Sequence, residues 1–281
     1  MRVLLAILLS LLCATASAQK GNSFGVAYYN VDKLYDTIPS RFYDDRAYTP
    51  AGRFGWDSNR YTHKIKQVAA VVDSIALPVV ALYGVENEQV VKDIVTACRG
   101  DYAYIHRTAN GYDGLDFALL YFADCFYPDK VTERQGVLCV EGEAFDRPLT
   151  IVATHRSQSL GVLLDELKTA EDNNIIILGD AGKLNFKKWA LVDATLGARW
   201  AGRGNRILRG VWHLQDCVLT NIEALNRSDV YIRPWLLDRR GVPFATFLGV
   251  NIAAGTLLAC LYTYISIIYL HFSKKVLILY G

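Results

Sequence analysis

The stretch "IIILGDAGKL", residues 175–184, predicts a buried β-strand that leaves its sheet at an acidic side chain. Three isoleucines and a leucine form a short apolar run that ends at Gly179, which is typical of a strand buried on both faces. A carboxylate at the end of such a strand, here Asp180, is well placed to hold a metal ion. Ala181 and Gly182 supply no further ligand, so Asp180 is either a working ligand or the remnant of one.

Helical and strand-like segments alternate on both sides of this stretch. Apolar residues recur at helical spacing over 62–76, 87–98 and 159–172. Apolar runs separated by Asn-Gly, Pro-Asp and Asp-Arg-Pro turn signals predict strands. These strands cover 24–31, 79–85, 102–106, 115–122, 136–142, 148–155 and 212–220. The order predicts an α/β sandwich, with two sheets packed together and helices outside.

Composition narrows the class of protein. The chain has 281 residues, 52% of them hydrophobic, and a formal net charge of +2. That is enough apolar material for one large domain or at most two. A net charge so close to zero gives no strong global field directed at nucleic acid or at a membrane surface. The sequence does not indicate an oligomeric state.

The two ends of the chain have their own composition. Residues 1–18 combine one early positive charge, an apolar run and a small-residue end, which predicts a signal peptide and an exported protein in the periplasm, in the cell envelope or outside the cell. A buried N-terminal helix is the alternative. Residues 247–270 contain no acid, lysine or arginine and are long enough to span a bilayer, which predicts membrane association through the tail.

Polar residues close several of the predicted strands. They are Asn30, His155, Asp180 and Asp216. Strand ends of an α/β fold commonly converge in one crevice, and this set of residues suits metal-assisted phosphoester hydrolysis. The plainer alternative is that each is a strand-end cap or a satisfied polar group.

Eight short motifs, in order, resemble those of exported members of the endonuclease/exonuclease/phosphatase superfamily. "YYNVDKLYDT" at 28–37 is similar to the family's opening "YNVENLFDT", and "VVALYGVEN" at 79–87 is similar to its "LqEVEN" segment. "GLDFALLY" at 114–121 resembles "GIDVALLY", and "IIILGDAGKL" resembles "iivlGDfNd". The resemblance covers about residues 24–250, and we expect the family-like domain to occupy 19–255.

The resemblance implies a four-layer α/β sandwich, two central mixed β-sheets flanked by helices, with Mg²⁺ or Mn²⁺ at the open strand ends. Asn30 matches the family's first Asn, and His155 matches the His that contacts the scissile phosphate. Asp180 matches the Asp that orients water. Asp216 and Asp116 match the Asp residues of the late strand and of the "GIDVALLY" segment. Asn30 and Asp180 are therefore the remaining candidate metal ligands.

The sequence departs from the family pattern at positions that the reaction needs. Gly84 stands where the family has its metal-binding Glu, and Gly182 stands where "GDfN" supplies an Asn. The closing "SDH" motif is absent after Gly255, so the general-base His is missing. Mg²⁺ needs carboxylate oxygens, and loss of a general base typically lowers the rate by ~10²–10⁴-fold. We expect metal binding and hydrolysis to be strongly impaired.

The resemblance also gives the tail a second interpretation. Read in a shifted frame from the Gly255 codon, the following residues can encode a segment similar to the family ending "YSDHLPVYVY" without its Asp and His. We hypothesise that 247–270 contains a frameshifted final strand. A genuine C-terminal transmembrane segment is the alternative.

The expected function is that of an exported protein whose ancestral reaction is Mg²⁺-dependent phosphoester hydrolysis. The expected ligands are a nucleic acid or a small phosphoester. Two alternatives remain open: an active nuclease or phosphodiesterase with relocated metal ligands, and a non-catalytic binding module of the cell envelope.

Overall fold

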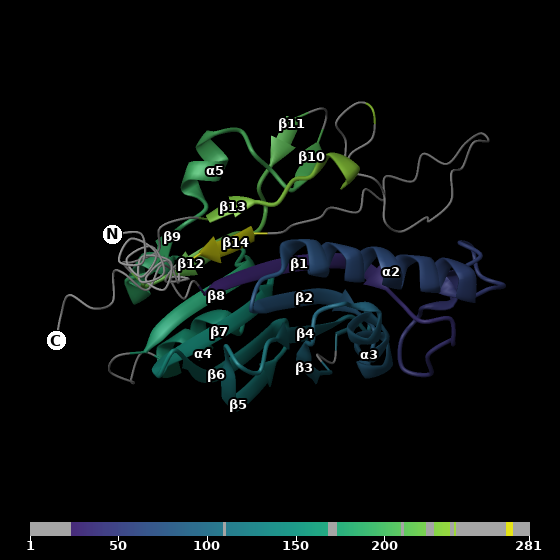
Figure 1. Cartoon of the computed structure of the whole chain (residues 1–281), viewed down its shortest axis with the longest axis horizontal. Helices are drawn as coiled ribbons and strands as arrows, with labels where there is room; N and C mark the ends of the chain where they lie inside the picture. Colours follow the sequence, from purple (N-terminus) through teal and green to yellow (C-terminus); the bar gives the residue numbers. More distant parts are fainter. Residues whose placement is uncertain are drawn as a thin grey trace, which may run out of the picture.

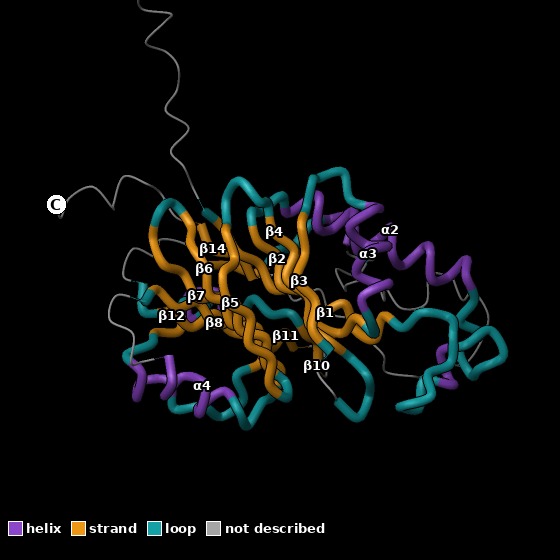
Figure 2. Tube along the Cα trace, turned by 90° about the horizontal axis from the view of Figure 1, so that it is seen from below, coloured by secondary structure: helices purple, strands orange, loops and turns teal. Residues whose placement is uncertain are grey.

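Two six-stranded sheets packed face to face form the centre of the computed structural model (Figures 1 and 2). The structure describes residues 24–108, 111–167, 173–208, 211–222, 228–236, 239 and 268–271. The first sheet has the order β13-β14-β1-β2-β4-β3, and the second has the order β5-β6-β7-β8-β12-β9. Both sheets are mixed: the pairs β1/β2 and β7/β8 are parallel, and β2/β4 and β8/β12 are antiparallel.

The bounds of the elements follow the apolar runs of the sequence. The first sheet contains β1 (Gly25–Leu34), β2 (Val79–Val85), β3 (Ala103–Arg107), β4 (Asp116–Tyr121), β13 (Ser228–Val230) and β14 (Ile268–His271). The second contains β5 (Tyr127–Arg134), β6 (Val137–Ala144), β7 (Arg147–His155), β8 (Asn174–Asp180), β9 (Val192–Asp193) and β12 (Cys217–Thr220). A small separate ribbon pairs β10 (Arg206–Leu208) with β11 (Val211–His213).

Helices cover the outer faces of both sheets. They are α2 (Ser58–Ile75), α3 (Glu88–Ala97) and α4 (Leu160–Leu167). The short α5 (Leu196–Trp200) is placed differently, because its buried Ala198 packs in the cluster between the two sheets. Short 3₁₀ turns lie at Arg46–Tyr48, Phe186–Trp189 and Pro234–Leu236. In Figure 2, α2 and α3 lie beside the first sheet, and α4 lies on the other side of the molecule beside the second sheet. Three buried clusters fill the spaces between these layers. The predicted four-layer α/β sandwich is therefore confirmed.

The start of α3 is positioned by its own sequence. Asn87 is the N-cap, and its side chain accepts a hydrogen bond from the Val90 amide at 3.0 Å. Such a cap satisfies an amide that has no partner within the helix and typically stabilises it by about 1 kcal/mol. Because α3 begins three residues after Val85, the last residue of β2, this cap lies directly beside the end of β2.

Two parts of the strand prediction were wrong. Pro128 and Asp129 do not form a turn; they lie in β5, an edge strand with a register shift between Pro128 and Lys130. An edge position tolerates proline because the missing amide need not pair. Residues 212–220 are not one strand, because Leu214–Asp216 separate β11 from β12.

Parts of the terminal predictions lie outside the described residues. These are the whole signal-peptide prediction at 1–18, and residues 247–267 of the apolar tail. Residues 268–270 of the tail belong to β14, which pairs antiparallel with β1 and with β13. Within the described part of the chain, no helix is both long and apolar enough to cross a membrane.

Candidate active site

The ends of β1, β2, β7 and β8 meet at one edge of the two sheets. The rings of Tyr83, near the end of β2, and His155, at the end of β7, stack with centroids 4.2 Å apart and planes inclined by 18°. β7 and β8 run parallel in a register that pairs His155 with Asp180. The structure thereby brings His155 and Asp180 together, with the Tyr83 ring stacked on His155.

Asp180 is buried and its carboxylate is held by three donors. Arg156 donates through Nε to Oδ2 at 2.8 Å, and Gln215 donates through Nε2 to the same oxygen at 2.7 Å. The amide of Gly182 donates to Oδ1 at 3.0 Å. Burial raises the pKa of the Asp180 carboxyl, but the hydrogen bonds from Gln215, Arg156 and Gly182 outweigh burial and lower the pKa below its ordinary value. Asp180 is therefore an ionised acid that already has an ion-pair partner.

Gly179 lets β8 deliver Asp180 to this position. Its φ is +109°, and a Cβ there would lie 2.2 Å from the Thr154 carbonyl oxygen and 2.8 Å from the Tyr28 ring. Both the backbone conformation and the close approach require a glycine. The "GD" pair in the sequence is thus a steric requirement of the junction between the two sheets.

Asn30 lies inside β1, before a bulge, and not at the strand's end. Its Oδ1 accepts a hydrogen bond from the Asp32 amide at 2.9 Å. Asp32 and Lys33 both have positive φ, and the pairing of β1 with β2 shifts register between Asn30 and Leu34. The bulge turns this part of the chain toward β2, so the Asn30 side chain is held by a local backbone distortion.

The side chain of Lys64 contacts the bulge of β1 from helix α2. Lys64 lies on α2, is fully buried, and donates through Nζ to the Asp32 carbonyl oxygen. Burial lowers the pKa of the Lys64 ammonium to about 8, and the nearby Asp32 opposes this shift. Lys64 and Asn30 therefore contact the same residue, Asp32, on its carbonyl and its amide.

Residue 84 faces into the site, but it has no side chain. A Cβ on Gly84 would lie 3.4 Å from Asn30 Oδ1, 3.2 Å from the Asp32 amide nitrogen and 3.3 Å from the Lys33 amide nitrogen. A side chain at this position would start directly beside Asn30. The φ of Gly84 is +92°, which side-chain-bearing residues rarely adopt.

His155 is mostly buried and electrically neutral at ordinary pH. Burial lowers the pKa of its imidazole, the Asp180 charge opposes this, and the Arg156 charge adds to it. Its Nδ1 is buried without a hydrogen-bond partner among the described residues, as is the hydroxyl of Tyr28 nearby. The site thus contains two buried polar atoms that the described protein groups leave unsatisfied.

Asp216 belongs to the same region although it does not end a strand. It immediately precedes β12, and because β12 runs antiparallel to β8, its first residue, Cys217, pairs with Gly179. Asp216 is buried and accepts a hydrogen bond from Asn205 Nδ2 at 2.6 Å. The prediction that Asp216 joins the site is consistent with this register.

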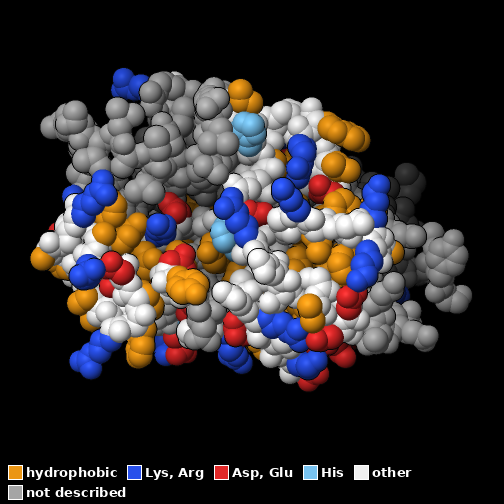
Figure 3. Space-filling model, turned by 180° about the vertical axis from the view of Figure 1, so that it is seen from behind, with side chains coloured by type: hydrophobic (Ala, Val, Ile, Leu, Met, Phe, Trp, Pro, Cys, Tyr) orange, Lys and Arg blue, Asp and Glu red, His pale blue; other side chains and the backbone are white. Residues whose placement is uncertain are grey.

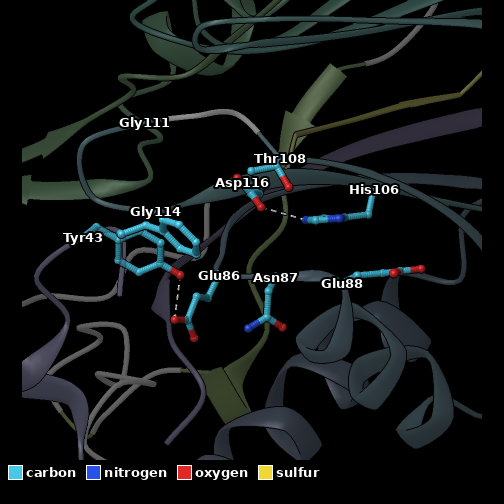
Figure 4. A pocket seen from close by; sticks show the side chains of 10 residues that line it. Tyr43, Glu86, Asn87, Glu88, His106, Thr108, Gly111, Gly114 and Asp116 are labelled. Atoms are coloured by element: carbon cyan, nitrogen blue, oxygen red, sulfur yellow. Dashed lines mark hydrogen bonds and ion pairs between the residues drawn. The ribbon is translucent and has the colours of Figure 1, made fainter. Parts of the chain in front are cut away.

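Asp116 lies in a neighbouring hollow of about 620 Å³ (Figure 4). Its Oδ2 is 2.9 Å from His106 Nε2, with which it forms a hydrogen bond. Glu86 lies in the same hollow and accepts a hydrogen bond from the Tyr43 hydroxyl at 2.8 Å. Burial raises the pKa of the Glu86 carboxyl to about 7. Asp116 therefore belongs to a separate acidic hollow beside the strand-end cluster.

The residues at the strand ends do not make a suitable Mg²⁺ site. Position 84 offers no side-chain oxygen. Both oxygens of Asp180 already accept hydrogen bonds, two on Oδ2 and one on Oδ1. Among the described residues, no group of three or more His, Cys, Asp or Glu side chains is arranged to hold a metal ion. Mg²⁺ binds through several oxygen ligands in near-octahedral geometry, and this donor set does not provide them.

Sequence reasoning missed the groups that hold the predicted residues in place. They are Arg156, Gln215, Asn205, Lys64 and His106. Two of them could have been found by their position next to predicted site residues in the sequence. Arg156 directly follows His155, and Gln215 directly precedes Asp216. Lys64 gave a weaker signal, as a charged residue four positions before Val68 on the apolar face of a predicted helix.

The face of the molecule drawn in Figure 3 carries charges of both signs. In Figure 3, lysine and arginine side chains are interspersed with acids across the visible described face. This agrees with the net charge of +2. Any recognition of a charged ligand must therefore depend on local groups and not on the field of the whole molecule.

Comparisons with known proteins identify the fold. Residues 25–155, from the start of β1 to the end of β7, match the model of the endonuclease/exonuclease/phosphatase family. No curated protein matches the chain.

Several solved structures share the architecture. TDP2 from C. elegans has a TM-score of 0.56 at 13% identity, over 94% of this chain and 80% of that chain. D. rerio TDP2 complexed with a single-strand DNA product has a TM-score of 0.51 at 13% identity, over 90% and 99% of the two chains. An endonuclease/exonuclease/phosphatase family protein from Leptotrichia buccalis has a TM-score of 0.53 at 10% identity, over 89% and 99%. The matched segment includes Asn30, Gly84, Asp116 and His155, and over this segment the chain is similar to the endonuclease/exonuclease/phosphatase family.

Proposed function

We propose that this chain is an exported member of the endonuclease/exonuclease/phosphatase family that recognises a phosphoester and has little or no metal-dependent hydrolytic activity. The observation that carries the proposal is the geometry of residue 84. A Cβ there would lie 3.4 Å from Asn30 Oδ1, yet the residue is glycine. A carboxylate needed to hold a metal beside Asn30 is therefore missing from the position that faces the site.

The state of Asp180 supports the same proposal. An acid that orients water or binds a metal must have an oxygen available to do so. Here the two oxygens accept hydrogen bonds from Arg156, Gln215 and Gly182. A metal ion or an activated water would have to displace one of these donors, which costs the charge-assisted hydrogen bond that it makes.

The ligand class follows from the fold and from one neighbour. The structure of D. rerio TDP2 is described as complexed with a single-strand DNA product. Nucleic acid is therefore one proposed ligand of this chain, and a small phosphoester is the other. Export rests on the pattern of residues 1–18 and is proposed on that basis.

The adjacent acidic hollow is where relocated metal ligands would most easily be found. The hydrogen bonds of its acids do not favour that role. Glu86 accepts hydrogen bonds from the Tyr43 hydroxyl and the Asp36 amide, and Asp116 is hydrogen-bonded to His106. These bonds fasten the loop around Tyr43 to the end of β2. The arrangement supports a structural role for the hollow's acids.

The test is a comparison of turnover between the full-length chain and its Asp180→Ala variant. Truncation before residue 268 is unsuitable because β14 pairs with β1 inside the first sheet. The substrates are bis(p-nitrophenyl) phosphate and single-stranded DNA, each with Mg²⁺ and with Mn²⁺. We expect the two proteins to be equally inactive within error. Metal-dependent turnover that Asp180→Ala abolishes would overturn the proposal.

A Gly84→Glu variant provides a further comparison. Its glutamate has to adopt, or relax away from, a φ of +92°, and such backbone strain costs about 1–3 kcal/mol. Because Arg156 still occupies Asp180 in that variant, we expect at most a partial gain of turnover. Full activity from this single change would show that Asp180 is available as it stands.

A further inference from the structure

A second hollow, of about 730 Å³, opens directly over Asp180. Its lining includes Arg156, Gln158, Lys183 and Gln215, together with Asp180 itself. The lining contains two basic side chains and one acid. The described lining of the neighbouring hollow contains Glu86, Glu88 and Asp116 and no lysine or arginine. The two hollows at this edge of the sheets therefore differ in the sign of their charge.

Arg156 is fixed on one side and open on the other. Its backbone amide donates to the Asp180 carbonyl oxygen at 2.7 Å, and its Nε donates to the Asp180 carboxylate at 2.8 Å. Its φ is +51°, in the left-handed region that favours glycine. The side chain is nevertheless 61% exposed, while that of Asp180 is 9% exposed.

The guanidinium has donors left over. Arginine carries five N–H donors in a fixed fork, and the Nε donor is the one that contacts Asp180. Within the described part of the chain, Nη1 and Nη2 have no protein partner. One edge of the fork therefore lies on a carboxylate and the other faces the hollow, which is a geometry suited to a second oxyanion.

Other groups in the lining favour an anion at the same place. Lys183 has no ion-pair partner among the described residues and contributes a second positive charge. Gly161, in the first turn of α4, also lines the hollow. The amino end of a helix carries a partial positive charge that favours a phosphate.

We propose that the Arg156 guanidinium is a built-in cation of this site, and that it binds a phosphate group against Asp180 without a divalent metal ion. In a metal-dependent phosphoesterase a mobile ion lies between the acid and the phosphate. In this chain a side chain joins the two, with Nε on Asp180 and the Nη atoms on the phosphate oxygens. The inference rests on the proposed function only in taking a phosphoester as the ligand.

The experiment measures binding to the full-length chain in the presence of EDTA, by isothermal titration calorimetry. The probes are inorganic phosphate and a short single-stranded DNA with and without a 5′-phosphate, which separate a terminal phosphate from a phosphodiester backbone. We expect a phosphate-bearing probe to bind in EDTA, with an affinity that added Mg²⁺ does not increase.

Two substitutions and one matched control locate the binding. Arg156→Gln should weaken binding by about tenfold, as expected for the loss of a charge-assisted, two-pronged contact. Lys183→Gln should weaken it by about two- to threefold, as expected for one exposed charge. The control is Arg99→Gln, because Arg99 is also an exposed arginine paired with an acid, Asp73, whose side chain is 8% exposed, but it does not line the hollow. It should leave binding unchanged.

The outcomes separate this inference from the proposed function. Phosphate binding that appears only with Mg²⁺, or that is equal in wild type and in a folded Arg156→Gln variant, would overturn the inference, as would no binding of any probe. Metal-dependent turnover alongside intact binding in EDTA would overturn the proposed function and leave the inference standing. Circular dichroism and melting temperature confirm that each variant is folded.

Discussion

Replacing the buried Lys64 by methionine should change the pH dependence of stability in a defined direction. Lys64 is 0% exposed, lies between α2 and the first sheet, and donates to the Asp32 carbonyl oxygen. Burial lowers the pKa of its ammonium from 10.5 to about 8. In the unfolded chain the same group regains its ordinary pKa of about 10.4. Folding therefore requires this cation to be either buried with its charge or deprotonated.

The size of the effect follows from the shift. A depressed lysine pKa costs stability in full below pH 8, and the cost disappears as the pH rises through the unfolded pKa. The shift of roughly 2.5 pKa units corresponds to about 3 kcal/mol at 1.36 kcal/mol per unit. About 2 kcal/mol of this cost disappears as the pH rises from 7.5 to 9.5. Lys64→Met removes the titration and adds only a constant for the lost hydrogen bond and the altered packing.

The assay is urea denaturation of wild type and variant at several pH values in this window. Burial raises the pKa of the Cys139 and Cys217 thiols to about 12, so in this window these thiols titrate only in the unfolded chain. Their effect opposes the trend, but it is common to both proteins. The difference between the two free energies of unfolding isolates Lys64. We expect the variant's relative stability to fall by about 2 kcal/mol from pH 7.5 to pH 9.5. Lys66→Met, on the exposed side of α2, should show no such change. A difference that stays constant with pH, or that grows, would refute the reasoning.

The other predictions concern the glycine junction and the two acids. Gly179→Ala should destabilise the fold by more than about 3 kcal/mol, because the added methyl group would lie 2.2 Å from a backbone oxygen. Gly182→Ala, which has open space around it, should destabilise the fold by about 1 kcal/mol. Thermal unfolding of the two variants measures the difference. Burial raises the pKa of Glu86 to about 7, so its contribution to stability is present below the pKa of the unfolded chain and is lost as the pH rises to about 7. Glu86→Gln should therefore reduce the pH dependence of the free energy of unfolding across that range. Arg156→Gln should raise the pKa of Asp180, because it removes one of the hydrogen bonds that lower this pKa. Carbon NMR of the Asp180 carboxyl group measures its titration, and an unchanged pKa in the variant would contradict the prediction.

Much of the fold could be predicted from apolar patterning alone. The run at 175–178 became β8, whose bounds, Asn174–Asp180, match the prediction, because a strand buried on both faces is apolar throughout. β5 could not be predicted in the same way. It is an edge strand, mostly half-exposed or exposed, and it contains Pro128, so neither apolar continuity nor alternation marks it. Tertiary pairing with β6, and not local preference, makes it a strand.

The positions of the site residues could be predicted, but their chemical state could not. The motifs placed His155 and Asp180 together, and the parallel register of β7 and β8 brings them side by side. That register also places Arg156, the next residue, beside Asp180. Its side-chain direction depends on a positive φ that the sequence does not mark, since glycine is the usual residue with this backbone. The motif therefore identified an acid, and the structure shows that it is already paired.

The two basic groups of this site explain why one substitution is not expected to recreate a metal centre. Arg156 neutralises Asp180 from the second sheet, and Lys64 places a positive charge behind Asp32 on the first. A metal ion at this edge would bring its own charge to groups that are already compensated, and like charges at close range in a poorly solvated site oppose binding. Adding a carboxylate at position 84 restores an oxygen ligand but leaves Arg156 on Asp180. The charge arrangement, and not only the missing ligand, therefore separates this site from one that binds a divalent ion.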